Sequence, residues 1–237
     1  MEKVVYALWR DAATARPDFN TRLRTELSPR LADLAHGVRI NIQDDDVLVS
    51  ESPRMAATHP QIEAVVQLWV DTARDKARAP IDALVAGLAP HYAAWLVSEA
   101  AEISNTLHPP TRGLRTEGFA QVVFLGRPPR LTWEAWREIW QRDHTLVGIE
   151  TQANFEYVQN LVVRPLTYGA PAYVAMIEEC FPTEAMFSEA VYFDGVGDLD
   201  RQLNNQAIMA ESCARFIDFD RIECIPTSQF EIKRLRE

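Results

Sequence analysis

One face of a predicted helix carries aromatic side chains and a histidine. Trp133, Trp136, Trp140 and His144 follow one another at offsets of three, four and four residues, which places them on the same side of a helix. An imidazole titrates near neutral pH, so His144 could take up or release a proton. It could equally be a structural residue that hydrogen-bonds a backbone carbonyl. The tryptophans could pack a core, and Trp140 could also contact an aromatic ligand.

The residues around this face predict where the helix begins and ends. Thr132 is suited to cap its amino terminus, and Glu134 lies in the first turn, where negative charge is favourable. Leu131, before the cap, and Trp136 could form a hydrophobic staple. We therefore expect a helix from Trp133 to about Gly148.

A strand predicted at Phe155–Val163 supplies the next candidates. Tyr157 and Gln159 lie on one face of this strand, and Asn160 lies on the other among valines. Because the valines suit packing beneath helices, we expect Tyr157 and Gln159 to point into the interior of a barrel. There the Tyr157 hydroxyl could donate to a carbonyl or enolate oxygen, or it could simply be held by a neighbouring side chain. Asn160 would belong to the site if the strand faced the other way.

Both halves of the chain show the same order of predicted elements. A segment with turn-forming residues, 105–116, separates a first unit at 1–104 from a second unit at 117–237, and each reads strand, helix, strand, strand, helix, strand. The elements of the first unit are Val4–Trp9, Asp18–Ala35, Val38–Ile42, Ala64–Val70, Ile81–Leu88 and Ala93–Ile103, the last of which could also be a helix. Those of the second are Phe119–Leu125, Trp133–Gly148, Phe155–Val163, Tyr173–Glu178, two helices at Thr183–Glu189 and Leu199–Arg215, and Arg221–Ile225.

This plan predicts an α+β protein built from two ferredoxin-like βαββαβ repeats. In such a unit both helices cover one face of a four-stranded antiparallel sheet, and the other face has to be buried. Two units packed sheet to sheet would bury both faces and form an intramolecular pseudo-dimeric α+β barrel. Trp9 and Trp69, on strands of the first unit, would then line the interior and could contact a substrate.

The second unit resembles the EthD-like family of dimeric α+β barrel proteins over most of residues 117–230. The resemblance rests on Trp136, Trp140, Asp143 and His144, on the strand sequence Tyr157-Val158-Gln159-Asn160, and on Phe216 and Asp218 before the last strand. It implies a tandem-duplicated barrel of this family. The first unit departs from the pattern, because Leu27 stands where the second unit has His144. A single site per chain is therefore expected.

The composition disfavours several classes of function. A net charge of −10 disfavours nucleic-acid binding, and no apolar run is long enough to cross a membrane. Three widely spaced cysteines predict reduced thiols in the cytoplasm rather than a disulfide framework. The five histidines show no paired metal-ligand spacing, and no phosphate-binding glycine loop or nucleophile elbow is present. We therefore expect neither a metal nor a cofactor.

Three hypotheses for the function remain. The first is a cofactor-independent enzyme in which His144 and Tyr157 carry out proton transfer during cyclisation, dehydration, decarboxylation or isomerisation of a small hydrophobic or aromatic metabolite. It rests on analogy with related barrels, and its substrate contacts would be Trp140, Gln159, Asn160, Trp9 and Trp69. The second is a non-catalytic binding or accessory protein of a degradative or biosynthetic pathway. The third is a haem-binding barrel, because some related barrels bind haem. Each could be a monomer or a homodimer.

Overall fold

A computed structural model of the protein describes residues 1–235. The strands are β1 (Glu2–Trp9), β2 (Gly37–Ile42), β3 (Ala64–Val70), β4 (His91–Ile103), β5 (Phe119–Gly126), β6 (Glu156–Pro165), β7 (Tyr173–Phe181) and β8 (Ile222–Lys233). The helices of the first half are α1 (Arg16–Arg22), the π-helical η1 (Leu23–Leu27), α2 (Ser28–Leu34), α3 (Asp45–Leu48) and α4 (Asp75–Leu88). Those of the second half are α5 (Trp133–Arg137), the π-helical η2 (Glu138–His144), α6 (Thr145–Thr151), the short η3 (Thr183–Met186), α7 (Glu189–Tyr192) and α8 (Leu199–Phe216).

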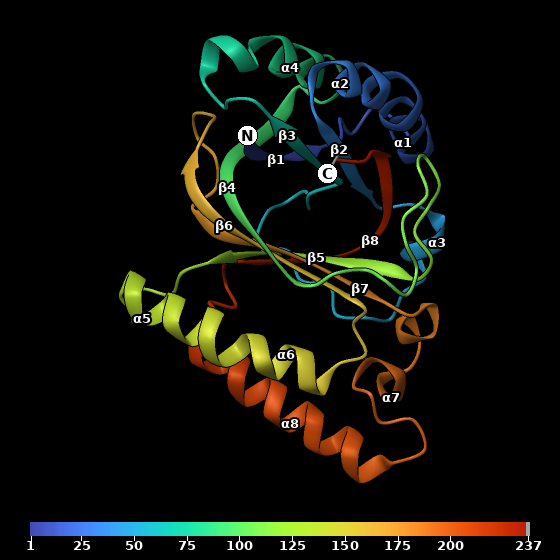
Figure 1. Cartoon of the computed structure of the whole chain (residues 1–237), viewed down its shortest axis with the longest axis vertical. Helices are drawn as coiled ribbons and strands as arrows, with labels where there is room; N and C mark the ends of the chain where they lie inside the picture. Colours follow the sequence, from blue (N-terminus) through green and yellow to red (C-terminus); the bar gives the residue numbers. More distant parts are fainter. Residues whose placement is uncertain (236–237) are drawn as a thin grey trace.

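The strands form a closed antiparallel barrel with the helices outside (Figure 1). Neighbouring strands follow the order β1-β3-β2-β8-β5-β7-β6-β4, and β4 closes onto β1. One group of helices, α1, α2 and α4, covers the strands of the first half, and α5, α6 and α8 lie against the opposite side of the barrel. The fold is therefore a mixed α+β barrel.

The prediction of two ferredoxin-like repeats packed sheet to sheet is wrong. The strands form one sheet that closes on itself, because β2 pairs with β8 and β4 pairs with β6 across the two halves. The last strand was expected to end at Ile225, but β8 continues to Lys233 and supplies the partner of β2. Closure satisfies the backbone groups that four edge strands would leave unpaired, which two separate sheets could not do.

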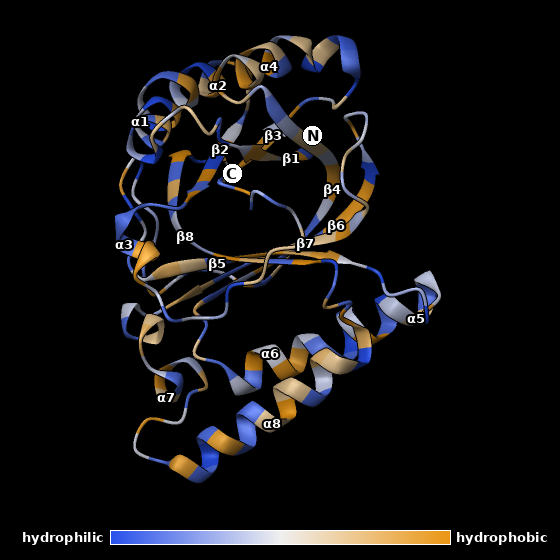
Figure 2. Cartoon of the chain, turned by 180° about the vertical axis from the view of Figure 1, so that it is seen from behind, coloured by the Kyte–Doolittle hydropathy of each residue, from blue (hydrophilic) through white to orange (hydrophobic). Residues whose placement is uncertain are grey.

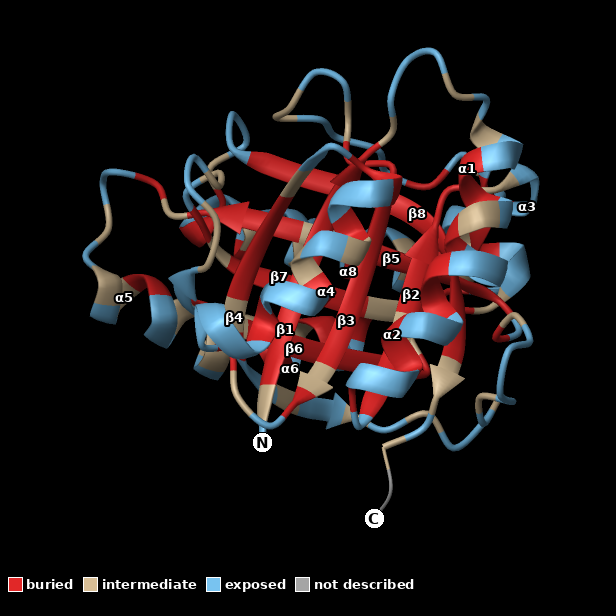
Figure 3. Cartoon of the chain, turned by 90° about the horizontal axis from the view of Figure 1, so that it is seen from above, coloured by how far each residue is buried: buried red, intermediate tan, exposed pale blue. Residues whose placement is uncertain are grey.

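Side chains are buried on both faces of the barrel wall. Along β1, Tyr6 and Leu8 pack outward beneath the helices, whereas Val5 and Ala7 point into the interior and join the core around Trp95. Figure 3 shows the result, with strands buried along most of their length and helices exposed on their outer faces. In Figure 2, α6 and α8 alternate between hydrophobic and hydrophilic residues, as expected of helices with one packed face.

Each half contains one long helix that widens into a π-helical segment. In both, the residue after that segment donates its backbone N–H and its hydroxyl to the carbonyl five residues earlier, Ser28 to Leu23 and Thr145 to Trp140. These two donors stabilise the wider turn. The matched turns agree with the predicted alignment of Leu27 with His144, although they do not confirm a tandem duplication.

The amino terminus of the second long helix agrees with its prediction. Thr132 caps it by accepting a hydrogen bond from the Ala135 amide at 3.2 Å. The helix then continues through η2 and α6 to Thr151, three residues beyond the predicted end. This continuity brings His144 against α8, where it contacts Ser212 and Phe216.

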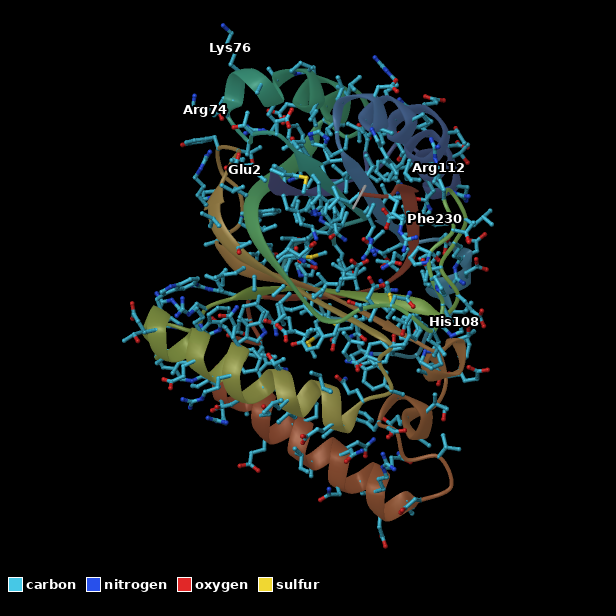
Figure 4. The ribbon with its side chains drawn as sticks, in the orientation of Figure 1. Glu2, Arg74, Lys76, His108, Arg112 and Phe230 are labelled. Carbon is cyan, nitrogen blue, oxygen red and sulfur yellow. The ribbon has the colours of Figure 1, made fainter. Side chains whose placement is uncertain are left out.

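The segment between the halves runs along one side of the barrel, where His108 and Arg112 mark its course (Figure 4). The His108 ring packs edge-on against Phe155, with 4.8 Å between ring centroids. The Arg112 guanidinium donates to the Ile232 carbonyl at 3.1 Å. The segment thus contacts β8 and the residue that precedes β6. Its predicted boundaries at 104 and 117 are not tested by these contacts and stay a prediction.

A buried charge cluster crosses the barrel interior. Arg39 on β2 contacts the carboxylates of Glu156, Glu178 and Glu231 at 2.8, 3.1 and 3.1 Å, and these acids come from three other strands. Burial favours a raised pKa of Glu178, but the Arg39 charge and several amide hydrogen bonds lower that pKa instead. The amide donors are Asn41, Gln67 and Gln229.

Candidate active site

The pocket nearest the predicted site residues lies outside the barrel, between its wall and the second-half helices. Its volume is about 180 Å³. Outward-facing side chains of β5, β6, β7 and β8 form one wall, and η2, α7 and α8 form the other. Pro53 and Met55, from the first half of the chain, close one side. A site in the barrel interior was expected, and the cavity shows that the helix–sheet interface is the better candidate.

His144 ends η2 and borders this cavity. Its Nδ1 lies 2.8 Å from the Ser212 hydroxyl on α8, and its ring is tilted by 52° against the Phe216 ring, with 4.5 Å between centroids. Burial, aided by the positive charge of Arg215, lowers the pKa of His144 to about 4. The imidazole is therefore neutral at pH 7 and can donate or accept a hydrogen bond without carrying charge.

Tyr157 and Gln159 face the helices, so the prediction that they point into the barrel is wrong. Tyr157 borders the cavity beside Trp140 and belongs to the same hydrophobic core. The Gln159 amide donates to the Tyr157 hydroxyl at 2.9 Å and to the Thr145 hydroxyl at 2.7 Å. The Tyr157 ring packs beneath the tryptophan-bearing helix, whereas the smaller Val162, on the other face of the strand, packs in the interior of the barrel. Burial, followed by the nearby Glu179 charge, raises the pKa of Tyr157, so the hydroxyl stays protonated.

Three other predicted substrate contacts lie inside the barrel, apart from His144. The Asn160 amide contacts the Met176 sulfur at 3.2 Å. The Trp9 indole donates to the Pro60 carbonyl at 3.1 Å, and the Lys3 ammonium lies 4.5 Å from the centroid of the Trp69 ring. None of these three residues borders the cavity between sheet and helices.

Glu179, on β7, is the acidic group of the cavity, and the sequence analysis missed it. Its Oε1 accepts a hydrogen bond from the Asn154 amide at 2.9 Å, the one donor it has among residues 1–235. The side chain keeps some accessible surface because it borders the cavity, yet protein surrounds it. Burial raises the pKa of Glu179 to about 7, and the Asn154 hydrogen bond only partly opposes the shift. A carboxylate near this pKa can gain or lose a proton at neutral pH.

One signal in the sequence could have revealed Glu179. The segment Ile177-Glu178-Glu179-Cys180-Phe181 places two adjacent glutamates inside an apolar run. Successive residues of a strand point to opposite faces of the sheet. If both faces are covered, Glu178 has to be buried on one face and Glu179 on the other. The predicted strand ended at Glu178, which left Glu179 outside it. In the structure β7 continues to Phe181, with Glu178 in the charge cluster and Glu179 in the cavity.

The remaining polar groups of the cavity are neutral. The Tyr192 hydroxyl donates to Gln121 Oε1 at 2.9 Å. Burial raises the pKa values of the Cys213 and Cys224 thiols to about 12, which leaves neither sulfur as a thiolate at neutral pH. The cavity therefore favours proton transfer through Glu179 over attack by a cysteine.

Other parts of the described chain offer weaker candidates. An open groove of about 880 Å³ is larger, but none of the predicted site residues lines it. Its charged lining residues are Asp33 and the cations Arg24, Arg112, Lys233 and Arg234. Within residues 1–235, no group of three His, Cys, Asp or Glu side chains is placed to hold a metal ion. No helix in that range has both the length and the apolar character needed to span a membrane.

Comparison with known proteins gives likenesses of fold alone. No family model matches the sequence, and neither does any curated protein. A crystal structure of an anthrone oxidase-like protein has a TM-score of 0.55 and 6% identity, covering 99% of this chain and 94% of that one. A "putative monooxygenase" from Lactobacillus acidophilus NCFM has a TM-score of 0.45 and 9% identity, covering 98% of this chain and 96% of that one. Another, from Fusobacterium nucleatum subsp. nucleatum, has a TM-score of 0.43 and 12% identity, with coverages of 98% and 92%. The first likeness shows that this chain shares the overall fold of that protein, and the EthD-like assignment is not confirmed.

Proposed function

We propose that the protein binds a small, uncharged aromatic molecule between sheet and helices and catalyses proton transfer on it with Glu179 as the base. The observation that carries this proposal is the position of Glu179, a carboxyl group with a pKa of about 7 in a cavity walled by Trp140, Tyr157 and Phe216. A base is most effective when its pKa lies near the working pH.

The neighbouring groups suit the same chemistry. The Glu179 carboxylate would remove a proton from carbon, and the resulting enolate oxygen would need a hydrogen-bond donor. Tyr157 is protonated and borders the same cavity, and Gln159 holds its hydroxyl oriented by donating to it. His144, neutral at pH 7, would supply a second hydrogen bond rather than act as the base.

Exchange of carbon-bound hydrogen tests the proposal without knowledge of the natural substrate. The probe is 2-tetralone, an uncharged two-ring ketone with weakly acidic C–H bonds beside its carbonyl. In D₂O, removal of a proton and return of a deuteron are read by proton NMR. We expect the protein to accelerate the exchange, with a rate that rises as pH passes about 7, because Glu179 then ionises. Glu179→Gln should lower the rate by about 10²- to 10⁴-fold.

Two comparisons complete this experiment. His144→Ala should reduce the rate less than Glu179→Gln, because the imidazole supplies a hydrogen bond and not the base. Equal exchange in the wild type and Glu179→Gln would refute the role of Glu179. Binding of 2-tetralone without any acceleration of exchange would instead indicate the non-catalytic binding or accessory role.

A methyl group added at Gly148 should probe the space beside Glu179. Its Cβ would lie 3.5 Å from Tyr157 Cε1 and 3.9 Å from Glu179 Oε1, which are ordinary contact distances. Gly148→Ala should therefore fold, with a gain of about 1 kcal/mol from helix propensity. It should weaken the binding of 2-naphthol by about tenfold, because the methyl group packs against Tyr157 and Glu179, which line the cavity, and restricts where they can move to admit a ligand.

Gly87 on α4 provides the matched control for this substitution. A Cβ at Gly87 meets no atom within 4 Å, so Gly87→Ala should bring a similar gain in stability and leave binding unchanged. Binding constants from fluorescence titration and unfolding in urea measure both effects. Unchanged 2-naphthol binding by Gly148→Ala would place the ligand elsewhere.

A further inference from the structure

A segment of the first half of the chain reaches over to the cavity of the second half. Residues 51–62, called the strap here, connect α3 to β3 and cross to β8. Met55 and Cys224 exchange two backbone hydrogen bonds, with N–O distances of 3.0 and 2.9 Å. The Cys224 thiol also donates to the Pro53 carbonyl at 3.2 Å. The strap therefore adds a short bridge to the edge of the cavity.

Hydrogen bonds to a buried carboxylate on β8 and within the strap hold it in this place. The Thr58 amide and hydroxyl both donate to Glu223 Oε1, at 2.5 and 2.6 Å, and Glu223 is fully buried. The Gln61 amide donates to the Met55 carbonyl at 2.7 Å. Hydrogen bonds to a buried carboxylate are strong, so the strap is fixed on both sides of Met55.

Met55 lies where this fixed strap meets the opening of the cavity. Its side chain lines the cavity and is 37% exposed, as expected of a residue at the mouth. Phe219 also lines the cavity and is 56% exposed. Most of the rest of the wall comes from β5, β7, β8, η2 and α8, which packing holds more rigidly. Met55 is thus the residue whose replacement enlarges the cavity with the least disturbance of the core.

The size of the cavity limits what it can hold. Its volume of about 180 Å³ is only a little larger than a cavity of about 150 Å³ that takes up a single benzene ring. One ring with a fused second ring is therefore near the limit. Among the described lining residues Glu179 is the acid and none is a lysine or arginine, so an anionic ligand would lack a counter-charge.

We propose that the cavity selects uncharged ligands of one or two fused aromatic rings, and that Met55 of the strap sets this limit. The proposal rests on the proposed function, because it names the class of molecule that the same site would take. A third fused ring would have to displace the Met55 side chain or the strap that carries it.

Equilibrium binding of two hydroxyarenes tests the size limit. The probes are 2-naphthol, with two rings, and 2-anthrol, with three, titrated against the tryptophan fluorescence of the full chain at pH 7. We expect the wild type to bind 2-naphthol at least about tenfold more tightly than 2-anthrol. Met55→Ala should bring the two affinities within about threefold by improving the binding of 2-anthrol.

Met209 on α8 offers a matched control, because it is a methionine in the wall opposite the sheet. Met209→Ala removes the same volume away from the strap and should change the selectivity less than Met55→Ala. An equal change in both variants, or a wild type that binds both probes equally, would overturn the assignment to Met55. Urea unfolding confirms that each variant is folded.

The same titrations separate this inference from the proposed function. Binding is read without turnover, so the ring-size limit is measured whether or not Glu179 exchanges protons with 2-tetralone. Replacing 2-naphthol with 2-naphthoate tests the charge requirement, and the wild type should bind the carboxylate at least about tenfold more weakly. Equal binding of 2-naphthoate would contradict the requirement for an uncharged ligand.

Discussion

Replacing Arg39 with methionine should destabilise the barrel by about 3–5 kcal/mol at pH 8. Arg39 is the shared cation of Glu156, Glu178 and Glu231, all of which are buried. The substitution keeps most of the side-chain volume but leaves three carboxylates in the interior without their partner. The cost comes from their uncompensated charge, so it should shrink toward pH 4, where carboxylates become protonated in the folded and unfolded chain.

The measurement is the free energy of unfolding in urea at several pH values. Arg30→Met removes the same charge from the exposed face of α2 and should change that free energy by less than about 0.5 kcal/mol. A loss of less than about 1 kcal/mol for Arg39→Met would mean that water or a rearranged side chain compensates the three carboxylates. The cluster would then not hold the barrel together.

The sequence was most informative where a single periodic helix decided the structure. Its spacing placed Trp136, Trp140 and His144 on one packed face, and Thr132 is the cap that its side chain predicted. These features are local, since they depend on residues within one or two turns. The helix was therefore predicted correctly, although the sequence pattern did not indicate which strands and helices pack against it.

The errors arose where a strand is buried on both faces. A strand with one solvated face shows alternating polar and apolar residues, but β6, β7 and β8 carry polar side chains on an interior face that is closed to water. Gln229 and Glu231 of β8 are buried in the charge cluster. Because the carboxyl-terminal part of this strand is rich in polar residues, the sequence pattern did not predict it to be a strand. Similarly, the orientation of Tyr157 depends on which face of the sheet the tryptophan-bearing helix covers. That is set by tertiary packing and cannot be predicted from the strand sequence alone.

Glu179→Gln should raise the stability of the protein at pH 8 relative to the wild type, while the two proteins differ much less at pH 5. Burial raises the pKa of Glu179 from an ordinary value of 4.5 to about 7, so the folded protein holds a proton that the unfolded chain has released between these values. Wild-type stability therefore falls as pH rises through this window. Glutamine does not ionise and removes the loss.

The full shift corresponds to about 3 kcal/mol, and partial exposure of the side chain reduces the expected difference to about 2 kcal/mol between pH 5 and pH 8. Other titrating groups cancel because both proteins share them, so the difference between their unfolding curves isolates Glu179. Glu150→Gln, on the exposed face of α6, controls for the change in net charge. A difference that stays flat from pH 5 to pH 8 would show that Glu179 is fully ionised at neutral pH. It would then be too weak a base for the proton transfer proposed here, and the cavity would be better understood as a binding site alone.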